Sequence, residues 1–269
     1  MGYYVKVEEN VNIYIEDSNP TSTKTILFIH GWPANHKMFE YQFDHLPAMG
    51  YRCIGIDTRG FGKSSRPWEG YSYDRLADDI RMIIDTLRLE NITLAGHSMG
   101  GAIAIRYMAR YDGHKVAKLA LFGAAAPVFT KRPDFPYGET VEEVNSLIEG
   151  TYADRPNMLR GFGDNFFARF LTDSFMDWFQ GLGLEASGNA TAKCLVSLRD
   201  EDLRRDLPLI RVPTAIFHGK QDKVCPFVLA ELMHAGIQNS TLIPFEYSGH
   251  GLFYCEKEKF NQELAQFIG

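Results

Sequence analysis

Short apolar runs rich in β-branched residues alternate along the chain with segments of helical periodicity. The first two runs, residues 3–7 and 11–15, alternate apolar and polar positions around a Glu-Asn pair, which predicts an N-terminal antiparallel hairpin. Six later runs are continuously apolar, as in strands buried on both faces: 25–29, 52–56, 92–95, 118–122, 214–217 and 242–245. Five predicted helices lie around them: 36–47, 73–89, 98–111, 227–235 and 256–268. The pattern predicts a mostly parallel, doubly wound α/β sheet with ligand sites at the carboxyl ends of its strands.

One segment breaks this alternation. Residues 127–208 contain no convincing strand, only short helical pieces rich in aromatic residues. We therefore expect a core in two parts, 1–126 and 209–269, with 127–208 inserted as a helical cap over the strand ends. Most of the aromatic side chains should form the small core of this cap, and a few should face a pocket. Residues 181–186 match G-x-G-x-x-A but follow a helical pattern, so we expect a loop there.

Composition narrows the classes of function. The 269 residues carry 28 Lys+Arg and 34 Asp+Glu, a net charge of -6, and no basic stripe that would track phosphates, so we expect no nucleic-acid partner. The longest apolar stretch is too short to span a bilayer, and no signal-peptide pattern is visible. Four scattered cysteines without metal-ligand spacing indicate free thiols in a reducing cytoplasm and no metal. The composition leaves open whether the chain forms a homo-oligomer.

The strongest chemical signal is Gly96-His97-Ser98-Met99-Gly100-Gly101, directly after one predicted strand and directly before a predicted helix. This is the G-x-S-x-G nucleophile elbow in its strand–turn–helix context. A serine at such a sharp turn has a strained backbone and an exposed hydroxyl. The flanking strand and helix approach so closely that side chains at Gly96 and Gly100 would collide. Ser98 is therefore the candidate nucleophile.

A serine hydroxyl needs a base and a carboxylate that orients the base. His250 follows the last predicted strand and has glycine on both sides, whereas His218 and His234 are better explained by structural roles. Asp222 is the only carboxylate in the loop after the penultimate strand. The acidic run at Asp200, Glu201, Asp202 and Asp206 is expected to be a solvated face. The predicted order Ser98, Asp222, His250 is that of the elbow-type hydrolases.

An oxyanion hole would complete this machinery. The strand at 25–29 ends in His30-Gly31-Trp32-Pro33, a turn that can direct a backbone N–H at the site. We expect the two donors to be the amides of Trp32 and Met99. Pro33 has no N–H and is expected to stiffen the turn.

The chain resembles the serine α/β-hydrolases, and within them the aryl esterases and the cofactor-free haloperoxidases, or perhydrolases. The matching motifs are HGWP (30–33), DTRGFGKSSRP (57–67), GHSMGG (96–101), HGKQD (218–222) and GHG (249–251). The resemblance implies an α/β-hydrolase fold and carboxylic-ester hydrolysis (EC 3.1.1) without a cofactor, with peracid formation when peroxide replaces water. Epoxide hydrolases share HGWP but carry aspartate at the elbow, so Ser98 indicates an acyl-enzyme.

The sequence thus predicts a cytoplasmic serine esterase for small, apolar acyl or aryl esters. Two alternatives stay open within enzymes: the same residues could open a lactone or cleave a C–C bond in a β-diketone-like substrate. A third reading is a ligand receptor on the hydrolase fold with little turnover.

Overall fold

A computed structural model describes residues 1–269 and contains one eight-stranded sheet, in the order β1-β2-β4-β3-β5-β6-β7-β8. Strands β1 and β2 form an antiparallel hairpin, β2 pairs antiparallel with β4, and every other pair is parallel. The strand bounds are β1 Gly2–Glu8, β2 Val11–Ser18, β3 Thr25–Ile29, β4 Arg52–Ile56, β5 Ile92–His97, β6 Val116–Phe122, β7 Thr214–Gly219 and β8 Ser240–Phe245. All eight predicted strands and the mostly parallel sheet are confirmed.

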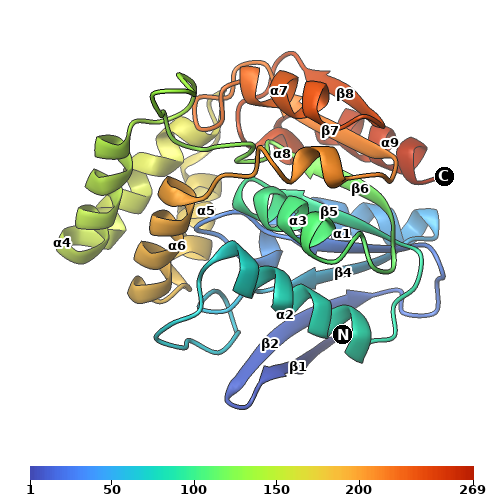
Figure 1. The fold of residues 1–269 in the computed structure, drawn as a ribbon. Coiled ribbons are helices and arrows are strands. Elements are labelled where there is room, and N and C mark those ends of the chain that lie inside the picture. Colours follow the sequence, from blue (N-terminus) through green and yellow to red (C-terminus); the bar gives the residue numbers. More distant parts are fainter.

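Helices cover both faces of the sheet (Figure 1). One face packs against α2 (Tyr73–Thr86), α3 (Met99–Arg110) and α7 (Val228–Gly236). The other packs against η1 (His36–Phe39), η2 (Leu46–Met49), α8 (Leu252–Cys255) and α9 (Lys257–Ile268). The helix predicted over 36–47 is instead two 3₁₀ turns around the short α1 (Glu40–His45). Pro47 lies in the first turn of η2, where a missing amide N–H costs little, and it cannot continue α1.

The chain between β6 and β7 is helical. It forms α4 (Val141–Phe166), α5 (Asp173–Leu184), α6 (Gly188–Asp200) and the short η3 (Leu207–Leu209), and α4, α5 and α6 lie together at one side of the sheet (Figure 1). The N-terminus of α4 is fixed by a capping box between Thr140 and Glu143, and α4 kinks at Asp154, just before Pro156. No helix in the chain has the length and apolar character needed to cross a membrane.

The prediction of a loop at 181–186 is wrong for its first four residues, because Gly181 to Leu184 form the end of helix α5. The packing of Gly183 explains the small residue there. A Cβ on Gly183 would lie 3.2 Å from Cγ of Pro33 and 3.3 Å from a methyl group of Leu159. Glycine therefore lets α5 approach both the turn after β3 and helix α4.

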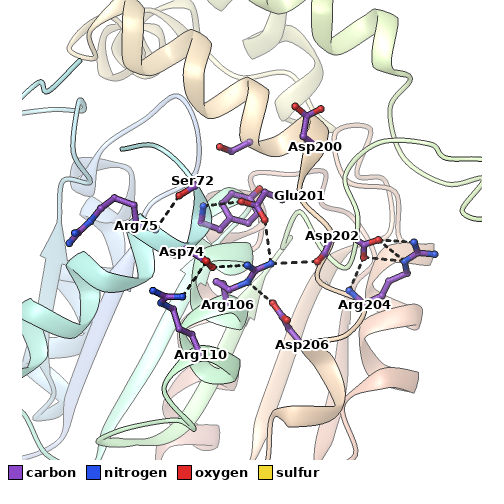
Figure 2. A network of polar contacts seen from close by, with 12 residues as sticks. Ser72, Asp74, Arg75, Arg106, Arg110, Asp200, Glu201, Asp202, Arg204 and Asp206 are labelled. Carbon is purple, nitrogen blue, oxygen red and sulfur yellow. Dashed lines mark hydrogen bonds and ion pairs between the residues drawn. The ribbon is translucent and has the colours of Figure 1, made fainter. Parts of the chain in front are cut away.

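The acidic run at the end of α6 is only in part the solvated face that the sequence suggests: the Asp200 side chain is 56% exposed, but Glu201 and Asp206 are engaged in ion pairs. Arg106 on α3 donates to Asp74 on α2 and to Asp206, each over 2.7 Å, and to Glu201 over 3.3 Å (Figure 2). The Asp206 and Glu201 side chains are only 16% and 22% exposed. This network fastens the segment that returns from α6 to two core helices.

Candidate active site

Ser98 lies at the sharp turn between β5 and α3, with φ 53° and ψ −119°, a region that side-chain-bearing residues rarely adopt. The glycines around it are sterically required. A Cβ on Gly96 would lie 2.3 Å from the carbonyl oxygen of Gly100, and one on Gly100 would lie 2.3 Å from that of Ile29. The predicted strand–turn–helix setting of the elbow is therefore present in the structure.

Asp222 and His250 form a hydrogen-bonded pair. Nδ1 of His250 lies 2.7 Å from Oδ2 of Asp222, and both side chains are completely buried. The other carboxylate oxygen, Oδ1, accepts the amide N–H groups of Val224 (2.9 Å) and Cys225 (2.8 Å). These bonds fix the carboxylate, which in turn fixes the orientation of the imidazole.

The loops that carry these two residues are packed against each other. The Gln221 amide donates to the Ser248 carbonyl over 3.0 Å, and a Cβ on Gly219 would lie 2.2 Å from the carbonyl oxygen of Gly249. Because β7 and β8 are parallel neighbours, their carboxyl ends bring residues 28 positions apart to one place.

The second nitrogen of the imidazole is free. Nε2 of His250 is buried and has no hydrogen-bond partner within the protein, Ser98 included. Ser98 itself lines an apolar cavity beside Trp32. A hydrogen bond between hydroxyl and imidazole is thus not made in this structure, and bonds of this type often tighten only when substrate is bound. The catalytic role of Ser98 with His250 stays a prediction.

Two backbone amides, one at the elbow and one in the turn after β3, have no hydrogen-bond partner. Neither Trp32 nor Met99 donates its N–H to another group of the protein, since Met99 is the first residue of α3 and Trp32 lies in a turn. The Trp32 indole is held by a 3.0 Å bond from Nε1 to the Thr191 carbonyl and by edge-on packing against Phe162. These amides are free to bind an anionic oxygen.

The cavity at Ser98 has two compartments. The inner one is a narrow space of about 10 Å³ that is apolar apart from the serine, and it is lined by Trp32, Ser98, Phe129, Leu147, Phe162, Leu195, Leu198 and Val224. A larger outer one, of about 610 Å³, shares Phe129, Leu147, Phe162 and Val224 with it and adds polar groups that include Glu139, Glu143 and Lys223. Phe129 and Phe162 are thus the aromatic residues of segment 127–208 that face the cavity.

Burial shapes the protonation of the side chains around the site. It raises the pKa of the Cys225 thiol well above its ordinary value, so this neighbour of Ser98 stays a neutral thiol. Burial, together with the nearby Glu143, raises the pKa of Glu139 to about 7. No group of three or more His, Cys, Asp or Glu side chains is arranged to hold a metal ion.

Three further residues contact the pair; the sequence predicts only a structural role for His218 and none for Gly123 or His97. His218 donates from Nε2 to the Cys225 carbonyl over 2.7 Å and lies 3.5 Å from Oδ2 of Asp222. Gly123 has a positive φ, and a Cβ there would lie 3.3 Å from Nδ1 of His250. His97 donates from Nε2 to the His250 carbonyl over 3.0 Å. Only the position of His218 at a strand end, four residues before Asp222, could have signalled such a contact.

Comparison with known proteins identifies the family and agrees with the fold. A family model described as "alpha/beta hydrolase fold" matches residues 24–256. The AB hydrolase superfamily protein YisY of Bacillus subtilis is 53% identical over 267 residues, which is 99% of each chain. An esterase from Exiguobacterium antarcticum is 49% identical with a TM-score of 0.97, covering 100% of this chain and 99% of its own. A bromoperoxidase from Bacillus anthracis is 34% identical with a TM-score of 0.96 over the same shares.

Proposed function

The chain is a hydrolase that belongs to the alpha/beta hydrolase fold family, and we propose that it cleaves small carboxylic esters through an acyl-enzyme on Ser98. The observation that carries this proposal is the buried Asp222–His250 pair at the same strand ends as the strained Ser98 turn. Such a pair supplies the oriented base that a serine hydroxyl requires at neutral pH.

In the proposed mechanism, His250 Nε2 takes the Ser98 proton as Oγ attacks the ester carbonyl. The carbonyl π electrons move to oxygen, and the unpaired amides of Trp32 and Met99 bind the resulting oxyanion. Each such donor contributes about 3 kcal/mol of transition-state stabilisation. The tetrahedral intermediate collapses, the C–O bond to the alcohol breaks, and the imidazolium protonates the leaving alcohol. Water, deprotonated by the same imidazole, then releases the acid and regenerates Ser98.

The two compartments suggest where the acyl part and the remaining part of an ester substrate would bind. The inner space beside Ser98 is apolar and very narrow, so it favours a short apolar acyl group, which enters only as the lining side chains move apart. The outer space is wider and carries charged groups, which favours the more polar part of the ester. We therefore propose small apolar acyl esters as the substrate class.

Perhydrolysis is the second candidate, and the bromoperoxidase among the similar structures favours it. Peroxide would replace water in the second half-reaction, attack the acyl-enzyme and leave as a peracid. Lactone opening and C–C cleavage use the same residues and differ only in the bond broken. A ligand receptor would show a burst of product and no sustained turnover.

The test is a rate panel with p-nitrophenyl esters of increasing acyl length, a lactone, a β-diketone, and acetate with peroxide. Ser98→Ala is the matched blank, since it removes one oxygen and leaves the turn. We expect sustained turnover that is fastest on short esters and absent in the variant. Turnover retained by Ser98→Ala, or a burst that stalls, would overturn the proposal.

A further inference from the structure

His97, the residue before the candidate nucleophile, is completely buried at the end of β5. Its Nε2 lies 3.0 Å from the backbone carbonyl oxygen of His250, and the two imidazole rings are 4.6 Å apart. A carbonyl oxygen only accepts hydrogen bonds, so Nε2 of His97 must carry the proton. The neutral ring then has its lone pair on Nδ1.

The surroundings of Nδ1 hold His97 in this neutral form. Nδ1 is buried without a partner, and a Cβ added to Gly31 would lie only 2.5 Å from it, so no acceptor has room there. Burial lowers the pKa of His97 well below its ordinary value, and the neighbouring His250, His218 and His30 lower it further when charged. His97 therefore stays neutral even when His250 is protonated.

The His97 bond acts on the peptide that follows the candidate base. His250 stands between Gly249 and Gly251, whose backbones can adopt more conformations than those of other residues. The peptide that joins His250 to Gly251 is held on both sides: its carbonyl accepts from His97, and its N–H donates over 3.1 Å to the carbonyl of Phe166, the last residue of α4. The elbow and α4 thus hold the same peptide.

We propose that His97 is a positioning residue for the reaction, whose Nε2–H holds the 250–251 peptide so that the His250 imidazole points at Ser98. The inference rests on the proposed function, because it assigns His97 a role only if His250 serves Ser98 as base. The His97 ring packs beside that of His250, but its hydrogen bond is made to the backbone of residue 250 and to none of the reacting atoms.

The first test compares His97→Phe with His97→Gln. Phe keeps an aromatic ring against Phe166 and Phe253 but removes the donor, whereas the Gln amide can reach the same carbonyl. We expect His97→Phe to lower kcat about tenfold with KM unchanged, as for loss of one hydrogen bond to a buried carbonyl, and His97→Gln to restore most of it. Phe253→Leu, a packing control beside the same ring, should keep kcat within twofold.

Wild-type kcat in His97→Phe, or equal losses in both variants and the control, would overturn the assignment. Failure of the proposed function would look different, because Ser98→Ala would then remain active. The second test needs no activity: in ¹⁵N spectra of the intact protein, His97 should keep a bare Nδ1 and a protonated Nε2 between pH 5 and 9. A proton on Nδ1 anywhere in that range would refute the inference.

Discussion

His250 and Asp222 share a 2.7 Å hydrogen bond in which both side chains are wholly buried. Asp222→Asn should keep the bonds from Val224 and Cys225 to Oδ1 but place an amide N–H against Nδ1 of His250. The imidazole would then carry its proton on Nε2 instead of Nδ1, so Nε2 could not accept the proton of Ser98. We expect kcat to fall on the order of 10³- to 10⁴-fold with little change in thermal stability. Steady-state kinetics and a melting curve check this, and a loss below tenfold would contradict it.

Leu147 lines both compartments of the cavity and is only partly buried, so its truncation enlarges the acyl space at modest cost in stability. Leu147→Ala should raise the ratio of kcat/KM for butyrate over acetate esters about tenfold, since one or two methylenes gain room. Val141→Ala is the control, because Val141 is exposed on the same helix and lines neither compartment. An unchanged ratio in Leu147→Ala would mean that the acyl group binds elsewhere.

Glu139 should make folding stability depend on pH. Its pKa is raised from 4.5 to about 7 by burial and by Glu143, so between these values the folded state holds a proton that the unfolded chain has lost. Stability therefore falls as pH rises from about 4.5 to 7. Glu139→Gln should remove this slope and be more stable than wild type at pH 8, by on the order of 1 kcal/mol given partial exposure.

Urea unfolding across this pH range measures the effect. Glu149→Gln serves as control, since Glu149 is exposed on the helix α4 that follows Glu139. A slope that survives in Glu139→Gln would show that another group is responsible.

The network around Arg106 should matter for stability rather than for chemistry (Figure 2). Arg106→Met leaves Asp74, Glu201 and Asp206 without their shared partner, and Arg106 is only 19% exposed. We expect a loss of about 2 kcal/mol in the free energy of unfolding. Arg160→Met breaks an exposed pair with Asp177 and should cost less than about 0.5 kcal/mol. Equal effects in the two variants would contradict the structural role of the network.

Much of this architecture could be predicted because it depends on local pattern. Continuous apolar runs predict buried parallel strands, and Gly96 and Gly100 at the elbow have the close backbone contacts that require glycine. The contact between Asp222 and His250 followed from the order of the last two strands. These features need only periodicity, turn chemistry and sheet topology.

What could not be predicted depends on tertiary contact. Glu201 and Asp206 look solvated in sequence because Arg106 is about a hundred residues away. Helix α5 continues through Gly181 and Gly183, and the close approach of Gly183 to Pro33 is a contact between distant parts of the chain. Likewise, nothing near His97 in the sequence indicates that its imidazole meets the carbonyl of residue 250.

Covalent labelling tests the role of Ser98 most directly. A p-nitrophenyl alkylphosphonate reacts with an activated serine, releases one p-nitrophenolate and leaves a stable phosphonyl ester. We predict one equivalent of p-nitrophenolate, complete loss of esterase activity, and the added mass on the peptide that contains Ser98. No labelling of Ser98→Ala should be seen. Label on a different residue, or full activity in protein phosphonylated at Ser98, would contradict the account.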